Sequence, residues 1–402
     1  MILFSWEYIT GMIIGSIIFW MFVPAHLRAH FITLASMLSI GLFQPIFTSI
    51  LIVLIIFVYL GAIRIQRGDK FAWVGMLILA IISILILAKY LFVYFEPLAG
   101  AVGFEKNYIV PLGISYLTLR LIDFIISVKR GVVKEISISN LFAYIMFLPT
   151  FPGGPIERYT KFIDDLKLSF NPERYFGGFL RIAIGFFKKI VLVDAILYSL
   201  LYTKIWPYVK AHTVWKDVPP EAAFAFILFT MLYAYIDLSS YADIAIGLGQ
   251  LFGLQTCEDM NYPMFSQNIS EFWKRWHMSL CMWCRNNVYF PALGLTRSNL
   301  ISLYIAFMIM GVWHYFAVKW VLWGLWQATG IVIYSIWAKY LKKHISPYFP
   351  IPSSIGHALG ATLTVIYVSF AYSVMMTDSL EQAHQILRGA LFLNRPLFDM
   401  VL

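Results

Sequence analysis

The sequence predicts an all-helical protein that crosses a membrane many times, and three observations indicate this fold class. Of its 402 residues, 60% are hydrophobic and only 13% are charged, which excludes a soluble domain. Apolar runs of spanning or near-spanning length recur along the whole chain. Short basic clusters stand between these runs, at 64–70, 129–134 and 339–343. They are typical of cytoplasmic loops, so the net charge of +9 reflects membrane topology and not nucleic-acid binding.

The apolar runs predict about eleven membrane segments within a single domain, 1–402. The apolar runs themselves lie at about residues 8–23, 31–43, 46–63, 72–95, 108–128, 138–150, 176–201, 222–236, 240–254, 300–315, 319–338 and 355–376. The first run lacks a small-residue cleavage pattern and is expected to be a retained span. Runs shorter than the usual ~20 residues, such as 138–150 and 240–254, predict half-helices or tilted segments packed within protein.

The stretch that follows Asn268 combines aromatic, basic and imidazole side chains. Asn268 and Glu271 form a capping-box-like helix start. Four residues then recur at helical spacing on one face, namely Trp273, His277, Leu280 and Cys284. The spacing predicts one helix of about 15 residues that is too charged to cross a bilayer, and therefore interfacial or re-entrant. Three basic residues belong to its other faces: Lys274, Arg275 and Arg285.

A second imidazole ends the apolar run 301–312, in the sequence Trp313-His314-Tyr315. A histidine in this position is either buried beside a polar partner or lines a wet cavity. Residue types alone favour a structural role for it. Cys281 and Cys284 form a Cys-x-x-Cys pair within the aromatic helix, where we expect small packing residues and no metal site.

Two polar clusters interrupt the apolar sequence. Asp237, Tyr241 and Asp243 lie within seven residues, so they share a polar pocket, line water or form a solvated loop. The turn-rich segment Pro-Gly-Gly-Pro-Ile-Glu-Arg-Tyr at 152–159 carries the adjacent Glu157 and Arg158. It predicts a re-entrant loop held by that pair.

Together these motifs resemble the membrane-bound O-acyltransferase (MBOAT) family, in its bacterial cell-envelope branch. They occur in the family's order: the segment 152–159, Asp-Leu-Ser-Ser-Tyr-Ala-Asp at 237–243, Glu-Phe-Trp-Lys-Arg-Trp-His-Met-Ser-Leu at 271–280 and Gly-Val-Trp-His at 311–314. The resemblance covers residues 108–338. Tyr315 stands where glycine is common and Gln327 where a further histidine often follows, departures that bear on the acceptor pocket more than on the chemistry.

The resemblance implies short or re-entrant helices around a central funnel, and an O-acyltransferase activity. A D-alanyl or acetyl group would move from a cytoplasmic thioester donor to a hydroxyl of a cell-envelope polymer, such as teichoic acid or an exopolysaccharide. His314 matches the family's catalytic histidine and is the expected general base, while His277 orients the acceptor or polarises the carbonyl. We expect substrate binding from Trp276, Trp313, Asp237, Tyr241, Asp243, Glu157 and Arg158. Lys274, Arg275 and Arg285 are expected to bind an acidic carrier protein.

The predicted location is the cytoplasmic membrane, and no tightly bound cofactor is expected. The donor is either the phosphopantetheine thioester of a carrier protein or acetyl-coenzyme A. Further expected partners are membrane lipid, the polymer acceptor and accessory envelope proteins. Two alternatives stay open. A transporter or flippase for a cell-envelope polymer or lipid-linked precursor would use Asp237 and Asp243 as a coupling-ion site, although no repeat is visible. A non-catalytic scaffold would need neither histidine in a polar pocket.

Overall fold

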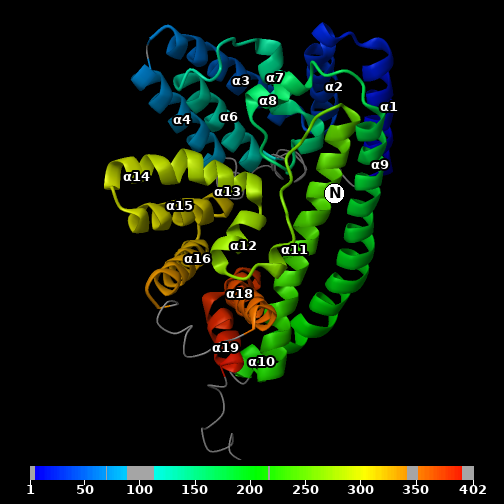
Figure 1. Cartoon of the computed structure of the whole chain (residues 1–402). Helices are drawn as coiled ribbons and strands as arrows, with labels where there is room; N and C mark the ends of the chain where they lie inside the picture. The colour runs from blue at the N-terminus through cyan, green and yellow to red at the C-terminus, as the bar shows by residue number, and fades with distance from the viewer. Residues whose placement is uncertain (1–4, 69, 88–112, 216–217, 342–351, 392–402) are drawn as a thin grey trace, which may run out of the picture. The chain divides into compact units, whose positions relative to one another are not determined.

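The computed structural model describes residues 5–68, 70–87, 113–215, 218–341 and 352–391, and within these ranges the regular structure is helical (Figure 1). The chain divides into two compact units. One comprises Met1–Ile184 with Tyr241–Glu258, and the other Gly185–Ser240 with Asp259–Leu402. The single domain expected for 1–402 stays a prediction.

The first unit contains the N-terminal helices. They are α1 (Trp6–Phe22), α2 (Arg28–Phe43), α3 (Pro45–Gln66), α4 (Lys70–Ile86), α6 (Ile114–Lys129), α7 (Ile138–Met146), α8 (Tyr159–Asp165), nearly all of α9 (Pro172–Phe186) and the end of α11 (Pro220–Leu251). Here α9 and α11 meet at glycines. A Cβ at Gly178 would lie 2.8 Å from the Gly247 carbonyl oxygen, so only small residues allow this approach, as is common between membrane helices.

The second unit contains the two histidines. Its helices are the π-helix Phe187–Ile205, α10 (Trp206–Trp215), most of α11, α12 (Ile269–Arg275), α13 (Met278–Cys284), the short π-helix Arg285–Tyr289, α14 (Phe290–Thr296), α15 (Asn299–His314), α16 (Val318–Ile336), the short π-helix Trp337–Leu341, α18 (Ser353–Met376) and α19 (Leu380–Ala390). Again glycines set the packing. A Cβ at Gly311 of α15 would lie 2.2 Å from the Trp320 carbonyl oxygen of α16. This contact places the end of α15, with His314, beside the start of α16.

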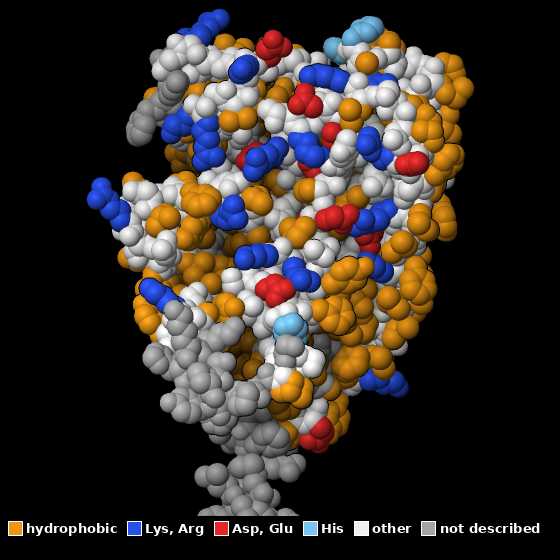
Figure 2. Space-filling model, viewed as in Figure 1, with side chains coloured by type: hydrophobic (Ala, Val, Ile, Leu, Met, Phe, Trp, Pro, Cys, Tyr) orange, Lys and Arg blue, Asp and Glu red, His pale blue; other side chains and the backbone are white. Residues whose placement is uncertain are grey.

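The described helices confirm an all-helical protein with several membrane spans. Five are long and apolar enough to cross a bilayer: Ala25–Phe43, Pro45–Gln66, Pro220–Leu251, Val318–Leu341 and Ser354–Met376. Three more are apolar but shorter, at Trp6–Phe22, Ala72–Ile86 and Asn299–His314. The total of about eleven and the central funnel stay predictions. Figure 2 shows many hydrophobic side chains on the surface, as expected for a protein whose helices face lipid. Phe176 and Leu180 of α9 are among the exposed large hydrophobic residues.

The prediction that 240–254 is a separate short helix was wrong. Residues 222–251 belong to the continuous helix α11, and the polar cluster 237–243 lies inside it and not in a solvated loop. Ser240 donates its hydroxyl proton to the carbonyl of Asp237 within the same helix at 2.6 Å, and the carboxylates have basic partners. These contacts satisfy the polar groups, so the helix can continue through them.

Candidate active site

The stretch around His277 is two short helices, so the prediction of one 15-residue helix was wrong. The start at Asn268 is as expected, because its side chain accepts the Glu271 N–H at 2.9 Å. Helix α12 ends at Arg275, and α13 begins only at Met278. Between them His277 adopts a left-handed backbone conformation with φ of +43°. Such a conformation is uncommon for residues other than glycine and often marks a functional site.

The break is held by backbone bonds to the segment 259–261. The Asn261 N–H donates to the Arg275 carbonyl at 2.8 Å, and the Met278 N–H donates to the Asp259 carbonyl at 2.8 Å. The helix is therefore interrupted by contacts with residues 14 and 19 positions earlier in the chain, which helical periodicity does not reveal.

His277 is buried against Asp259, a residue that the sequence analysis missed. Its Nδ1 lies 2.8 Å from Asp259 Oδ2, and the Ser279 N–H donates to Oδ1 of the same carboxylate at 3.0 Å. Burial alone would raise the pKa of Asp259, but the imidazole and the bonds from His277 and Ser279 outweigh burial and lower that pKa. An ionised carboxylate at Nδ1 orients the imidazole ring and sets its tautomer.

His314 ends α15 inside a group of tryptophans. Its ring stacks on Trp320, with centroids 4.8 Å apart and planes at 22°, and meets Trp313 and Trp323 edge-on at 4.7 and 5.9 Å. The imidazole is half-buried. Trp313 was predicted to lie at the site, whereas Trp320 and Trp323 were missed. The sequence signal that could have indicated them is that they lie three positions apart, on one helical face, at the start of the apolar run 319–338.

Aromatic contacts join the surroundings of the two histidines. Trp323 meets Trp273 at 5.6 Å and Tyr372 at 6.3 Å, and Tyr372 meets Trp276 at 5.3 Å. Trp276 is buried and directly precedes His277. The structure therefore brings both predicted histidines to one aromatic cluster of the second unit. Aromatic walls of this kind limit the access of water, which an acyl-transfer site requires.

Two buried side chains of this cluster and a third that follows it in α16 have hydrogen-bonding atoms without a partner among the described residues. They are the indole N–H groups of Trp273 and Trp323 and both polar atoms of the fully buried Gln327. Gln327 follows Trp323 by one helical turn of α16. A buried donor left unpaired costs about 1–3 kcal/mol, so these groups are suited to bind a carbonyl, a hydroxyl or water.

Asp237 has basic partners within the second unit. Lys189 Nζ lies 2.8 Å from Asp237 Oδ1 and 3.0 Å from Asp194 Oδ1, and Lys188 donates to the Ser239 hydroxyl at 2.8 Å. These pairs account for the carboxylate in an apolar helix without a bound cation. A role of Asp237 in substrate binding stays a prediction.

The other four predicted substrate-binding residues belong to the first unit. Asp243 pairs with Arg181 at 2.6 Å, and the ring of Tyr241 lies against Gly153. Glu157 accepts the Cys257 N–H and pairs with Lys161 at 3.4 Å. The expected Glu157–Arg158 pair was therefore wrong, because α8 starts at Tyr159 and turns Lys161 back towards Glu157, four residues away. Arg158 is exposed.

The predicted carrier-binding residues differ in availability. Lys274 and Arg285 are exposed, and the Arg285 guanidinium lies 5.5 Å from the Phe290 ring centre. Arg275 pairs with Glu271 at 2.7 Å.

The nearby thiols pack as expected: Cys281 donates to the Trp276 carbonyl at 3.3 Å, and burial raises the pKa of Cys284 to about 12.

Comparisons with known proteins support the resemblance seen in the motifs. The model of the family "MBOAT, membrane-bound O-acyltransferase family" matches residues 85–380. A teichoic acid D-alanyltransferase of Bacillus subtilis (strain 168) is 30% identical over 59% of this chain and 62% of its own length. One of Streptococcus thermophilus is 29% identical over 69% and 68%, and a probable alginate O-acetylase of Azotobacter vinelandii is 30% identical over 56% and 44%.

The match thus spans about three fifths of the Bacillus protein and less than half of the Azotobacter protein. The family model, in contrast, covers well over half of this chain, including both histidines and their tryptophan neighbours. The chain therefore belongs to the membrane-bound O-acyltransferase family.

Proposed function

We propose that this protein transfers a D-alanyl or acetyl group from a cytoplasmic thioester to a hydroxyl of a cell-envelope polymer, teichoic acid or an exopolysaccharide. The protein would act in the cytoplasmic membrane, with a carrier protein or acyl-coenzyme A as donor and accessory envelope proteins as further partners. The arrangement of His314 on Trp320 inside the tryptophan group, in a chain of this family, carries the proposal.

In this proposal His314 is the general base. The imidazole takes the proton of the acceptor hydroxyl as the hydroxyl oxygen attacks the thioester carbonyl carbon. The carbon–sulfur bond then breaks, and the imidazolium gives the proton to the departing sulfur, which leaves as a thiol. His277, held by Asp259, orients the acceptor or polarises the carbonyl. The unpaired donors of Trp273, Trp323 and Gln327 are candidates to bind the carbonyl oxygen or the acceptor. Exclusion of water by the aromatic side chains would protect the thioester from hydrolysis.

Transfer can be tested with purified protein in liposomes. A D-alanyl-loaded carrier protein and acetyl-coenzyme A, each radiolabelled, are supplied on one side, with teichoic acid or an exopolysaccharide as acceptor. We expect label on the acceptor from one donor, transferred at least about a hundredfold more slowly by His314→Ala. Passage of a lipid-linked polymer across the membrane without acyl transfer would support the transporter alternative instead.

Gln327→Leu should raise the melting temperature and lower transfer. Replacing a buried unpaired amide by an apolar side chain of similar size removes a desolvation cost of about 1–3 kcal/mol. If Gln327 binds a substrate, kcat/KM should fall roughly tenfold or more at the same time. Thermal melts in detergent and initial rates measure the two effects. The fully buried Ser302, whose hydroxyl bonds to the Ser298 carbonyl, provides a Ser302→Ala control that removes a satisfied group. Unchanged transfer by Gln327→Leu would exclude the assigned role.

The double variant Lys274→Glu/Arg285→Glu should weaken binding of an acidic carrier about tenfold, because both side chains are exposed and electrostatic attraction favours association. Binding by the native protein should also weaken with salt, and the variant should lose most of that dependence. Carrier titrations at two ionic strengths measure both effects. The exposed Lys204 of the same unit gives a matched control, Lys204→Glu. Equal carrier affinity in the double variant and the control would argue against this surface.

A further inference from the structure

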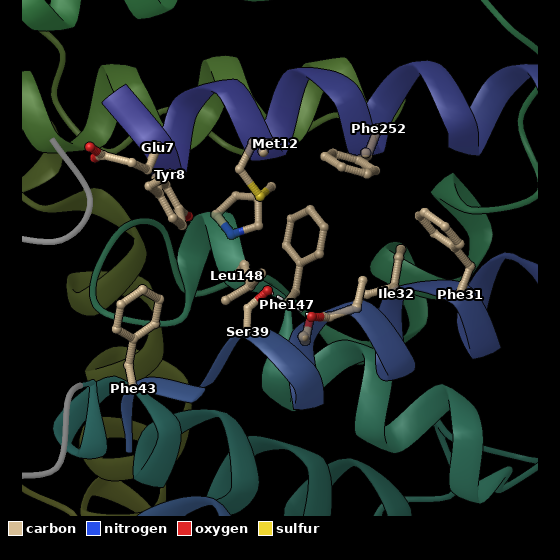
Figure 3. A pocket seen from close by; sticks show the side chains of 15 residues that line it. Glu7, Tyr8, Met12, Phe31, Ile32, Ser39, Phe43, Phe147, Leu148 and Phe252 are labelled. Carbon is tan, nitrogen blue, oxygen red and sulfur yellow. Dashed lines mark hydrogen bonds between the residues drawn. The ribbon is translucent and has the colours of Figure 1, made fainter. Parts of the chain in front are cut away.

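A cavity of about 220 Å³ lies between α1, α2 and the segment 147–149 in the first unit (Figure 3). Its walls are mostly apolar and include Met12, Phe31, Phe43, Phe147 and Phe252. The volume is below the roughly 300–1,000 Å³ of pockets that enclose a whole drug-sized ligand. The cavity therefore suits part of a long apolar molecule and not a complete polar one.

One wall holds a buried hydroxyl that lacks a partner. The Tyr8 hydroxyl is inaccessible to solvent and has no hydrogen-bond partner among the residues that the structure describes. Figure 3 shows Tyr8 pointing towards the middle of the lining residues, while the Glu7 carboxylate points away from them. A buried hydroxyl without a hydrogen-bond acceptor costs free energy. A ligand that carries one oxygen acceptor beside an apolar chain would supply that acceptor to the Tyr8 hydroxyl and fill the apolar space.

The surface around the cavity is apolar. Ile14 of α1 is 53% exposed, and Leu38 and Leu42 of α2 are 59% and 81% exposed. Residues Ala25–Phe43 form a candidate membrane span, and Gly11 and Phe43, which line the cavity, are themselves exposed. In a bilayer such a surface faces lipid. The acyl chains of lipids are therefore the groups present at the highest concentration next to the cavity.

We propose that this cavity binds one acyl chain of a membrane glycerolipid, with the Tyr8 hydroxyl donating a hydrogen bond to the ester carbonyl. Glu7 lines the cavity next to Tyr8 and its side chain is exposed, so its negative charge would repel the carboxylate of a free fatty acid but not an uncharged ester. The cavity is lined by residues of the first unit, whereas His277 and His314 of the proposed reaction belong to the second.

Gly11 allows the cavity to be filled without a clash. A Cβ added at Gly11 meets no atom within 4 Å, and the residue lies in the middle of α1. Gly11→Leu should therefore project a side chain into the space that the acyl chain takes. Gly75 of α4 is a matched control, because it is also helical, exposed and open to a Cβ, but does not line the cavity. Both substitutions improve helix propensity by a similar amount.

The experiment uses the whole protein in nanodiscs that contain phosphatidylcholine with a diazirine near the carbonyl end of one acyl chain. After illumination, mass spectrometry locates the labelled peptides. We expect labelling of the segments that contain Met12 and Phe31, a decrease of about tenfold with Gly11→Leu, and native labelling with Gly75→Leu. Tyr8→Phe should weaken labelling about fivefold, the usual worth of one hydrogen bond.

A second variant that fills the cavity keeps the test decisive if Gly11→Leu does not fold. Ala35→Phe fills the same cavity from α2, and thermal melts show which variants are folded. A diazirine fatty acid with a free carboxyl should label the native protein less than the ester, and Glu7→Gln should narrow this difference. Native labelling of a folded Gly11→Leu or Ala35→Phe variant would overturn the proposal, as would stronger labelling by the free fatty acid than by the ester.

Discussion

His314→Ala should lower kcat by about two to four orders of magnitude, the usual worth of a positioned acid–base group. Alanine cannot take the acceptor proton, and within the described part of the chain no other histidine is in ring contact with Trp320. Transfer from the loaded donor, measured in single turnovers, reports the chemical step. The protein should remain folded, because the imidazole is only half-buried.

His314→Phe separates chemistry from packing. Phenylalanine keeps an aromatic ring for the stack on Trp320 but cannot accept a proton, so this variant should be as inactive as His314→Ala. His384→Ala, at an exposed histidine of α19, should retain native transfer and serves as the control. Recovery of transfer in His314→Phe would assign His314 a packing role and contradict general-base catalysis.

Local chemistry made much of the fold and part of the site predictable. The helix start at Asn268 needs only the side chain of one residue and the N–H three positions later, so it is visible in the sequence. The local pattern also draws attention to His314, because an imidazole at the end of a nearly uninterrupted apolar run is either buried beside a polar partner or lines a wet cavity. Its expected catalytic role came from the family resemblance and not from this pattern. Its neighbours Trp320 and Trp323 require the turn between α15 and α16, which Gly311 makes close and which periodicity alone does not show.

The break at His277 was not predictable for a related reason. Helical spacing treats residues 268–284 in isolation, whereas the structure exchanges helical hydrogen bonds there for bonds to Asp259 and Asn261. Asp259 itself lies in a polar stretch between apolar runs, and nothing local indicates its pairing with a histidine 18 residues later. Similarly, Asp237 and Asp243 interrupt an apolar pattern, but their partners Lys189 and Arg181 lie on another part of the chain.

Asp259→Asn should lower kcat by about 10- to 100-fold, as loss of a supporting partner does elsewhere. The carboxylate serves two neighbours, with Oδ2 facing His277 Nδ1 and Oδ1 accepting the Ser279 N–H. An amide has a single acceptor oxygen, so one neighbour would face an NH₂ group. Because the folded protein lowers the pKa of Asp259, its carboxylate is ionised at neutral pH. The ionised carboxylate stabilises the folded state, and this contribution is lost only as the pH falls from about 3.9, the ordinary pKa of Asp, through the lower pKa that Asp259 has in the folded protein.

The test of Asp259 as a positioning residue is a double-mutant cycle with His277→Asn. Asparagine tolerates the left-handed backbone at position 277 and keeps a hydrogen-bonding side chain, so His277→Asn should retain measurable transfer. If Asp259 acts only through His277, Asp259→Asn/His277→Asn should transfer no more slowly than the slower single variant. Asp378→Asn, at an exposed carboxylate paired with Lys210, should leave the rate unchanged. Losses that multiply in the double variant would show that Asp259 contributes independently of the imidazole.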